Sequence, residues 1–358
     1  MFSHNHYVPV LRWKQGEIAA LHNLYEQDRS RVTPLIELVP SDFTEAKIRK
    51  CGGLNDKLEK TVDQIRKALR VSPFFVDLGL LTGLPCESQD AKHLLEILGD
   101  HVRHTDSAMI PVTGIDRPQK YQSAVKALAE KTKERVCLRL TPTDLRRPNC
   151  PQKLNDLLNG LDVSPSQAHL IIDLQLVNGF HQDLKDLSTR IPSLSKWITF
   201  TIIGGAFPPD LTDYDPGEHE VERSDWLTWR EHVVTEPKLP RIPTYGDYTT
   251  RHPVFFEPPP GVRVSASIRY TADEYWVVMR GEWVNKPGGS GHKQYQANAV
   301  LLRERPEFSG AEFSEGDRYI AQMDLRSSKT GNATTWVQAS VNHHMTFTVR
   351  QIADLFAP

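Results

Sequence analysis

Charged residues that could do chemistry stand inside short apolar segments of this chain. In "HLIIDLQL" the carboxylate of Asp173 alternates with aliphatic neighbours, late in the segment. Successive side chains of a strand point to opposite faces, so this pattern predicts one aliphatic face and one face that carries a charge. Other charges in the same position are Glu37 in "PLIELV" (34–39), Asp77 in "FFVDLGL" (74–80) and Arg139 in "VCLRL" (136–140).

Three further charged residues stand at the ends of similar segments. Arg12 and Lys14 end "YVPVLRWK", and Asp247 lies in "PTYGDY". If these strands are parallel and close into a barrel, all these charges meet at its carboxyl-terminal mouth, where barrel enzymes carry their sites. Carboxylates there can act as general acid or base, and cations can hold phosphate. A purely structural ion-pair network, for example between Arg139 and Asp173, is the alternative interpretation.

A metal site is the next possibility that the carboxylates raise. Four carboxylates at one mouth are hard oxygen ligands that suit Mg²⁺ or Mn²⁺. No H-x-x-x-E or similar spacing supports such a site, so we assign no metal ligands and leave the cofactor unknown, with Mg²⁺ or Mn²⁺ as the open possibility. His4 and His6 precede the first strand and are expected as a surface pair at the bottom of the barrel.

Two other stretches suit phosphate or base recognition. Gly204 and Gly205 in "GGAFP" follow a predicted strand, where they could cradle a phosphate or make a tight turn with positive φ. Arg269, Tyr270 and Arg280 in "IRYTADEYWVVMRGEW" suit stacking on a base or holding a phosphate. An ordinary half-buried hairpin explains the same residues equally well.

Adjacent histidines stand near the end of the chain, in "TTWVQASVNHHMTF". Neighbouring residues diverge in strands and in helices, so His343 and His344 cannot both face one target. Either one of them is functional at the mouth, or Asn342 begins the last helix and the histidines are structural. We expect this stretch to fold back over the barrel mouth and to bring one histidine near Asp247 or Arg269.

The candidate catalytic residues are therefore Lys14, Glu37, Asp77, Arg139, Asp173, Asp247, His343 and His344. The candidate ligand-binding residues are Arg12, Gly204, Gly205, Arg269, Tyr270 and Arg280.

Eight strand-like segments position these residues, and most are followed by a helical pattern. In 56–70, for example, Leu58, Val62, Ile65 and Leu69 share one helical face. Alternation of strands and helices implies parallel strands, and eight units predict a (β/α)8 TIM-barrel-like α/β fold. A doubly wound open sheet is the alternative. The strand segments are 7–13, 34–39, 74–80, 109–113, 136–140, 169–176, 198–203 and 243–248.

The last hundred residues do not continue the alternation of strands and helices. We expect a barrel over 1–256 and a C-terminal α+β extension over 257–358, packed on the barrel mouth and not independent. Two strands around Ala272 and Asp273 form a predicted hairpin, followed by a helix at 294–305 and a closing helix at 346–356.

Composition limits the class of protein. The chain has 358 residues and a formal net charge of -2, which argues against a broad nucleic-acid surface but not against a local basic groove. We see no signal peptide and no stretch of about 18 apolar residues, so we expect a cytoplasmic protein without membrane contact. The four cysteines match no zinc module and are expected as free thiols: Cys51, Cys86, Cys137 and Cys150.

Several motifs in order resemble the Beta protein family of bacteria and phages over essentially the whole chain. They include "YVPVLRWKQGE", "PLIELVP", "FVDLGLL", "IPVTGIDR", "GGAFPPDL", "YGDYTTRHP", "SASIRYT", "GDRYIAQ" and "GNATTW…NHH". The resemblance implies a cytoplasmic protein encoded near phage-related genes and a role in phage–host conflict. It carries over no catalytic residues. In the family Trp336 is usually followed by Arg, and here Val337 stands in that place.

Two functions remain open from the sequence. The first is an enzyme or sensor that binds or processes a phosphate-bearing ligand, a nucleotide or nucleic acid, at the mouth during anti-phage defence. The second is a non-catalytic barrel that recognises a protein or nucleic-acid partner, such as an effector protein or a phage component. The sequence does not decide whether the protein is an enzyme.

Overall fold

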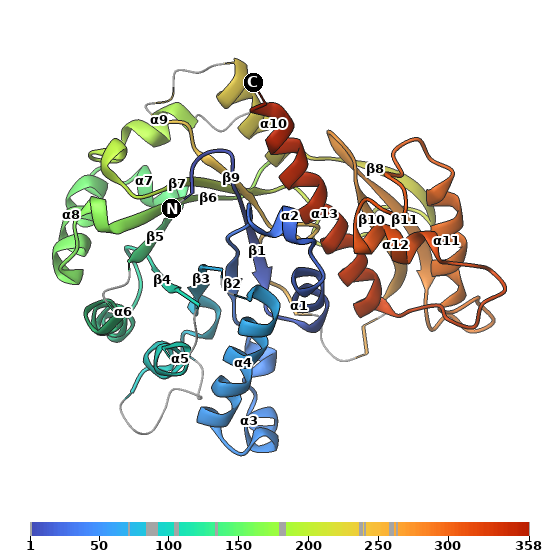
Figure 1. The fold of residues 1–358 in the computed structure, drawn as a ribbon, viewed down its shortest axis with the longest axis horizontal. Coiled ribbons are helices and arrows are strands. Elements are labelled where there is room, and N and C mark those ends of the chain that lie inside the picture. Colours follow the sequence, from blue (N-terminus) through green and yellow to red (C-terminus); the bar gives the residue numbers. More distant parts are fainter. Residues whose placement is uncertain are drawn as a thin grey trace.

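Eight parallel strands form a closed barrel in the computed structural model, in the order β1-β2-β3-β4-β5-β6-β7-β9 (Figure 1). This confirms the predicted (β/α)8 fold and excludes the open sheet. The strands are β1 (Tyr7–Arg12), β2 (Leu35–Glu37), β3 (Phe74–Asp77), β4 (Met109–Thr113), β5 (Val136–Leu140), β6 (Ala168–Leu176), β7 (Phe200–Gly205) and β9 (Thr244–Asp247). The structure describes residues 2–70, 72–83, 92–103, 107–132, 135–178, 184–235, 239, 241–257, 261–262 and 264–357.

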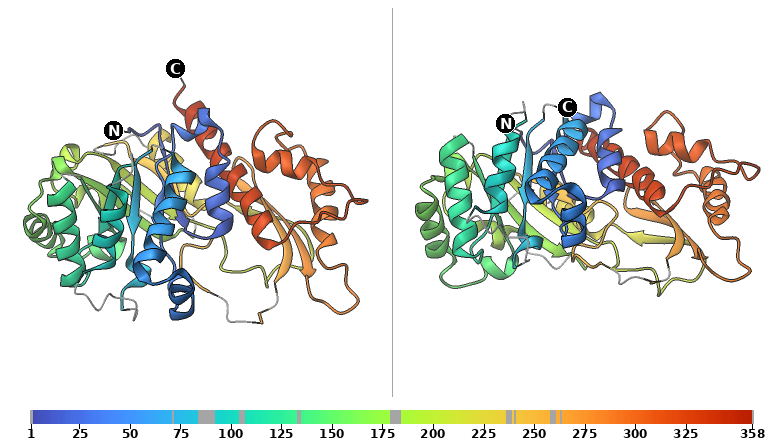
Figure 2. Two further views of the ribbon diagram at one scale, coloured as in Figure 1. Left: turned by 60° about the horizontal axis from the view of Figure 1, so that its bottom comes forward. Right: turned by 90° about the horizontal axis from the view of Figure 1, so that it is seen from below.

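Helices surround the barrel, as the apolar patterns predict (Figure 2). In α4 the predicted face of Leu58, Val62, Ile65 and Leu69 is buried. The helices of this layer are α1 (Gln15–His22), α2 (Glu26–Arg29), α3 (Glu45–Cys51), α4 (Leu54–Leu69), α5 (Leu94–Val102), α6 (Gln119–Thr132), α7 (Pro142–Leu145), α8 (Cys150–Leu161), α9 (Leu184–Thr189) and α10 (Ser224–Arg230).

Side chains fill the interior of the barrel below the mouth. Phe75, Ile110, Val112, Ile171 and Ile203 pack together there, and all are buried. The lower and middle levels of the barrel are therefore apolar. The charged side chains at the carboxyl-terminal ends of the strands lie above this apolar interior.

A second, three-stranded sheet forms the core of the extension. Its order is β10-β11-β8, with β10 (Ser265–Thr271) and β11 (Tyr275–Trp283) as the predicted hairpin. The third strand, β8 (Gly217–Glu222), was not predicted, because its polar sequence GEHEVE lacks an apolar face. β8 comes from the chain between β7 and α10, so this sheet includes a strand that precedes the expected division at residues 256 and 257. That division remains a prediction.

One long helix, α13 (Ala333–Leu355), joins the extension to the barrel, and it lies between them in Figures 1 and 2. It packs against α1 on the barrel side and against β10 on the other. The predicted closing helix at 346–356 is therefore too short. Asn332, not Asn342, caps the helix, and its side chain accepts hydrogen bonds from the backbone N–H groups of Thr334 and Thr335. A helix covered on several sides shows no single apolar stripe, which hid its first half from sequence analysis.

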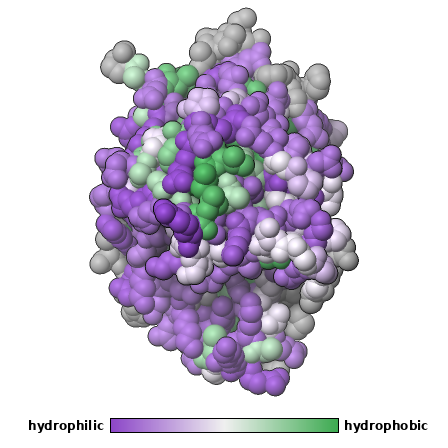
Figure 3. Space-filling view, turned by 90° about the vertical axis from the view of Figure 1, so that its right-hand side faces the viewer, coloured by the Kyte–Doolittle hydropathy of each residue, from purple (hydrophilic) through white to green (hydrophobic). Residues whose placement is uncertain are grey.

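Two shorter helices complete the extension, α11 (Lys293–Arg303) and α12 (Glu315–Ala321). The side of the extension that faces away from the barrel is mostly hydrophilic around one apolar area (Figure 3). Leu301 of α11 and Leu325 after α12 are exposed by 52% and 60%.

Cys51, Cys137 and Cys150 are free thiols, as predicted, whereas Cys86 lies outside the described residues. Within the described part of the chain, no helix combines the length and the apolar character needed to cross a membrane.

Candidate functional site

A cleft of about 540 Å³ opens at the carboxyl-terminal ends of the barrel strands. The sequence-predicted residues Glu37, Asp77, Arg139 and Asp173 all line it. Strand register explains this convergence, because Glu37 of β2 pairs directly with Asp77 of β3. Both residues end their strands with the same inward parity. Their location at one mouth follows from the fold, and their function stays a prediction.

Arg139 is the centre of the polar floor of this cleft. Its Nη1 donates to Glu37 Oε1 and to Asp77 Oδ2, each at 2.8 Å, and its Nε donates to Asp173 Oδ2 at 2.9 Å. Its Nη2 donates to the hydroxyl of Tyr248 at 2.7 Å, and that hydroxyl donates to Asp173 at 2.6 Å. One guanidinium thus binds three carboxylates that are nearly inaccessible to water.

The electrostatics of this floor favour the charged forms of Arg139 and Asp77. Burial lowers the pKa of Arg139, but Tyr248 and the three carboxylates outweigh burial and raise it well above its ordinary value. Burial raises the pKa of Asp77, whereas Arg117 and Arg139 lower it, and the balance keeps it below 3.8. The floor is therefore a rigid ion-pair network.

Arg117, from the loop after β4, was not predicted as a site residue. Its Nη2 lies 2.8 Å from both carboxylate oxygens of Asp77. A Cβ on Gly79 would lie 1.8 Å from Nη1 of Arg117, so the glycine leaves free the space that this guanidinium occupies. The place of Arg117 directly after a predicted strand, in "IPVTGIDR", is the signal that could have identified it.

Three charged side chains form the rim of the cleft: Arg147, Asp116 and Asp144. Arg147 donates to both oxygens of Asp116, at 2.8 and 2.5 Å, and lies 3.4 Å from Asp144. Asp144 also accepts hydrogen bonds from the backbone and the hydroxyl of Thr141. The Arg147 side chain is 30% exposed, so a ligand can reach it from solvent.

One wall of the cleft is apolar and follows β9. It contains Pro253, Val254 and Phe255. The guanidinium of Arg12 and the ammonium of Lys14 lie 5.2 and 5.6 Å from the centre of the Phe255 ring. Both candidates thus lie behind this wall, and neither lines the cleft itself. Lys14 forms an ion pair with Glu257 at 2.8 Å.

Carboxylates outnumber arginines in the described lining. Five carboxylates face three guanidiniums, a formal charge of -2: Glu37, Asp77, Asp116, Asp144 and Asp173 against Arg117, Arg139 and Arg147. No three acidic, histidine or cysteine side chains among the described residues are arranged to hold a metal ion. The guanidinium of Arg139 stands among the carboxylates where a bound cation would otherwise balance them.

Asp247 does not join this cleft, contrary to our expectation. It is one residue out of phase with the inward positions of β9, so its side chain leaves the barrel on the outer side. There its Oδ2 lies 2.9 Å from Nε2 of His344, and the hydroxyl of Tyr7 donates to its Oδ1 at 2.5 Å. The predicted proximity of His344 and Asp247 is confirmed, but at the side of the barrel, where both residues are fully buried.

The protonation states of this pair follow from its contacts. Burial lowers the pKa of His344 and favours the neutral ring. Burial raises the pKa of Asp247, yet His344 and Tyr7 outweigh burial and keep it below its usual range. Neutral His344 can then donate from Nε2 to Asp247 and accept at Nδ1 from the hydroxyl of Thr271, at 2.8 Å.

His343 points to the other side of α13, into the core of the extension. Its ring nitrogens contact Asp317 Oδ2 at 2.8 Å and the Thr271 carbonyl at 2.9 Å. Tyr270 stacks on the His343 ring at 3.8 Å and donates to Asp317 at 2.7 Å. The expected placement of these residues at the mouth is wrong, because α13 packs beside the barrel. Asn342 also lies inside the helix and bonds to Gly316 and Ala20.

The two candidate glycines serve close packing within β7. Neither has a positive φ, so the tight-turn interpretation is wrong. A Cβ on Gly204 would lie 2.9 Å from Val177, and one on Gly205 would lie 3.1 Å from Pro253. These neighbours explain the two glycines by packing, and the binding of phosphate by them stays a prediction.

Two candidate arginines come from the hairpin of the extension. Arg280 donates from Nε to the Leu211 carbonyl at 2.7 Å and so holds the segment between β7 and β8. Arg269 donates to the Thr250 carbonyl at 2.5 Å and lies 4.2 Å from the ring of Phe207. Neither residue lines the mouth cleft.

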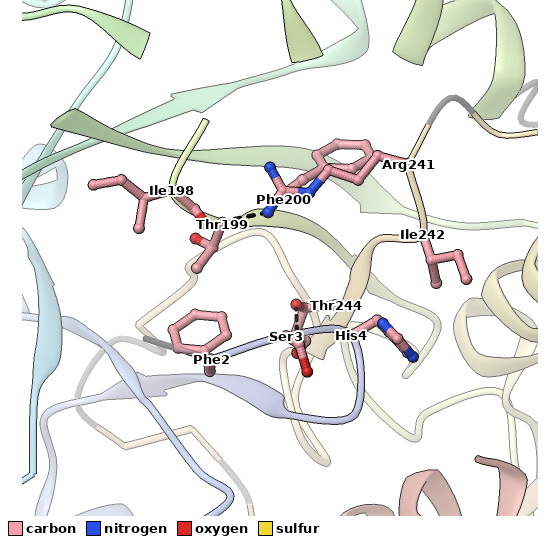
Figure 4. Close-up of a pocket in the computed structure, with 9 residues that line it drawn as sticks. All are labelled: Phe2, Ser3, His4, Ile198, Thr199, Phe200, Arg241, Ile242 and Thr244. Carbon is pink, nitrogen blue, oxygen red and sulfur yellow. Dashed lines mark hydrogen bonds between the residues drawn. The ribbon is translucent and has the colours of Figure 1, made fainter. Parts of the chain in front are cut away.

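A second hollow, of about 510 Å³, lies at the opposite end of the barrel (Figure 4). Its lining includes Ser3, His4, Thr199 and Arg241. The guanidinium of Arg241 donates to three backbone carbonyls that include those of Trp197 and Ile198, so it holds the loop before β7. His4 lies at this bottom end, as the sequence predicted.

These features define a (β/α)8 barrel with a charged mouth cleft and a helix–sheet extension at its side. The chain belongs to the Beta protein family, whose model matches residues 7–350. A mutant tryptophan synthase alpha-subunit from the hyperthermophile Pyrococcus furiosus is a similar solved structure, with 12% identity and a TM-score of 0.38. The match covers 69% of this chain and 89% of that one. No curated protein matches the sequence.

Proposed function

We propose that the protein binds a phosphate-bearing ligand, a nucleotide or the end of a nucleic-acid strand, in the mouth cleft together with Mg²⁺ or Mn²⁺. The observation that carries this proposal is the pair of accessible arginines, Arg117 and Arg147, within a carboxylate-rich lining. Planar guanidinium groups bind phosphate oxygens in a bidentate manner. Both arginines are partly exposed, at 22% and 30%, whereas Arg139 is committed to the floor.

The negative charge of the lining supports a ligand that arrives with its own cation. A free triphosphate would be repelled by a cleft of formal charge -2. Mg²⁺ keeps several waters and is usually held by one or two carboxylates plus the phosphates of the substrate. Asp116 and Asp144 at the rim are suitable carboxylates, since they lie beside Arg147 and near solvent.

The apolar wall supports a ligand that also has a flat aromatic part. Val254 and Phe255 line the same cleft as Leu80 and Ile115. Aromatic side chains such as Phe255 can stack on any nucleobase, with little preference for sequence.

The proposal is one of binding, because the floor carboxylates are poor candidates for general bases. Proton uptake by Asp77 would have to break its ion pairs with Arg117 and Arg139. Turnover of the ligand remains part of the wider proposal, and product formation in the binding assay would reveal it.

Calorimetric titration with ATP in the presence and absence of Mg²⁺ tests the proposal. We expect binding with Mg²⁺, and affinity at least about tenfold lower in Arg117→Gln and in Arg147→Gln, since a charged hydrogen bond contributes about 1.5–3 kcal/mol. Arg66→Gln is the control for loss of an arginine outside the cleft, because Arg66 is exposed on the outer helix α4 and lies 3.8 Å from Asp63. Equal affinity in Arg147→Gln and Arg66→Gln would refute the proposal. A 5′-phosphorylated oligonucleotide tests the nucleic-acid arm in the same way.

We propose further that this binding serves anti-phage defence, a context that rests on the family. Cells that express the protein should resist at least one phage in a broad panel. Cells that express Arg147→Gln should lose that resistance at equal protein level. Equal plating of every phage on both strains and on empty cells would refute this context.

A second candidate function is recognition of a protein partner beside the mouth. The observation in its favour is a run of exposed apolar side chains after β9, in which Val254 and Phe256 are exposed by 57% and 70%. If this alternative holds, the wild-type protein does not bind Mg·ATP, and Phe256→Ser abolishes phage resistance. Phage resistance in the Phe256→Ser variant equal to that of the wild type refutes it.

A further inference from the structure

Three arginines lie along the segment after β9, where the barrel and the extension join: Arg269 and Arg12 bind the carbonyls of Thr250 and Pro253, on either side of Arg251. Arg12 ends β1, Arg251 follows β9, and Arg269 lies in β10. Arg251 binds Glu17 of α1, with contacts of 3.2 Å from Nε and 3.1 Å from Nη2. Glu17 is only 2% exposed, whereas the Arg251 side chain is 32% exposed, so the junction is closed to water on the side of Glu17 and open on the side of Arg251.

Arg269 has no carboxylate partner within ion-pair distance among the described residues. Its guanidinium contacts the Thr250 carbonyl and the face of Phe207. Burial lowers the pKa of Arg269 to about 9, and the positive charge of Arg251 acts in the same direction. Arg269 is half-buried, and a cation taken partly out of water without an anion is costly, because neither a carbonyl nor an aromatic ring neutralises its charge.

Arg12 is only weakly compensated. Its Nη2 donates to the Pro253 carbonyl at 2.7 Å, and its Nε lies 3.8 Å from Glu37. Glu37 is already bound by Arg139 at 2.8 Å. Three guanidiniums therefore share Glu17 and a distant, occupied Glu37, and the junction lacks negative charge.

Unsatisfied polar atoms mark the same place. Nε of Arg12, Oε2 of Glu17 and Oγ1 of Thr249 are buried and have no hydrogen-bond partner. Thr249 also has a φ of 56°, in the left-handed region. Non-glycine residues in that region cost energy and gather at ligand sites. Nε of Arg12 and the hydroxyl of Thr249 are therefore free donors, whereas Oε2 of Glu17 is a free acceptor, and Thr249 adjoins Thr250, whose carbonyl binds Arg269.

We propose that Arg12, Arg251 and Arg269 form a binding site for a phosphate group, separate from the mouth cleft. A phosphate supplies the missing negative charge and oxygens for the idle Nε of Arg12 and hydroxyl of Thr249. Access is from the side of Arg251, whose side chain is 32% exposed. None of the three arginines lines the mouth cleft, so this site does not rest on the proposed function.

A bound phosphate would also act on the mouth. The segment from Thr249 to Phe255 contacts the arginines through the carbonyls of Thr250 and Pro253. Its last residues, from Pro253 on, form the apolar wall of the cleft. Phosphate at the junction therefore stabilises one wall of the cleft from behind.

The test is thermal unfolding of the full chain with increasing inorganic phosphate, with chloride adjusted to keep ionic strength constant. The wild-type midpoint should rise saturably, because a ligand that binds only the native state stabilises it. Arg269→Met should abolish this rise. Arg280→Met is the matched control, because Arg280 lies in the same sheet, in β11, and like Arg269 donates to a backbone carbonyl, that of Leu211.

Phosphate-free buffer separates a binding role from a structural one. There Arg269→Met should be at least as stable as the wild type, because it removes an uncompensated charge. A large loss of stability in Arg269→Met but not in Arg280→Met would overturn the proposal, since Arg269 would then be an anchor for Thr250. An equal phosphate-dependent rise in the wild type and in Arg269→Met would also overturn it.

Mg·ATP distinguishes the source of the phosphate and separates this site from the cleft. If ATP but not inorganic phosphate raises the midpoint, and Arg269→Met but not Arg147→Gln abolishes the rise, the site takes the phosphate of a larger ligand. If neither compound raises the wild-type midpoint, the proposal is refuted. Failure of Arg147→Gln to alter ATP binding refutes only the proposed function.

Discussion

Replacement of Arg139 by Met tests whether the floor of the cleft is one coupled network. Arg139 binds three carboxylates whose side chains are 2 to 7% exposed, so the substitution leaves buried negative charge without its cation. Removal of one partner of a buried ion pair typically costs about 3–5 kcal/mol. We expect a loss in that range in the free energy of unfolding, measured by urea titration at pH 7.

The remaining contacts indicate where the cost arises. Asp77 keeps Arg117 at 2.8 Å, and Asp173 keeps the hydroxyl of Tyr248 and the backbone N–H of Gln175. Among the described residues, Glu37 then keeps only the cation of Arg12, at 3.8 Å. The double variant Arg139→Met/Glu37→Gln should therefore recover about 1–3 kcal/mol of the loss, in the range of coupling energies for residues in contact.

The pH dependence has a defined sign. The pKa of Asp77 in the folded protein lies below its ordinary value of 3.8, so its contribution to stability is present above pH 4 and is lost as pH falls. Arg139→Met weakens that depression, so the gap between variant and wild type should be full at pH 7 and narrow below pH 4. Arg66→Met on α4 is the control. A loss below about 1 kcal/mol at pH 7, within the range of exposed pairs, would refute the network interpretation.

Two further changes probe the buried side of the barrel and the last helix. Burial and the nearby charge of Asp247 raise the pKa of Asp225 from 3.8 to about 7. Between these pH values the folded state binds a proton that the unfolded state releases. The free energy of unfolding of the wild type should therefore fall as the pH rises from 4 to 7. Asp225→Asn should flatten this fall, by up to about 4 kcal/mol, in urea titrations at several pH values; parallel curves for variant and wild type would contradict the assignment. Truncation after Arg326 removes α13 with its buried Val341 and Met345, each worth roughly 1.5–3 kcal/mol, and should abolish cooperative thermal unfolding, whereas removal of residues 357–358 should not. A cooperative transition near the wild-type midpoint in the long truncation would show that α13 is dispensable.

The barrel and the floor of its mouth could be predicted from local sequence patterns. Alternation of period two places Glu37, Asp77, Arg139 and Asp173 on the inner faces of their strands, and parallel strands bring their carboxyl ends together. Local rules were sufficient here, because the position of each residue depends only on its own strand and on closure of the barrel.

Outside those strands, the packing of the helices and loops determines which side chains come into contact. Asp247 is offset by one residue from the inward-facing positions of β9, so its side chain points out of the barrel. The docking of α13 against α1 places His343 and His344 away from the mouth. Sequence spacing could not reveal this, because the docking surface of a helix that is covered on several sides leaves no periodic signal.

The contacts of the loops and of strand β8 also depend on segments far apart in the chain. Arg117 reaches Asp77 only because the loop after β4 folds over Gly79, and β8 pairs only because β11 offers it an edge. The arginine cluster of Arg12, Arg251 and Arg269 likewise comes from three distant segments. Contacts between segments far apart in the chain depend on how the elements pack, and no local pattern in the sequence encodes that packing.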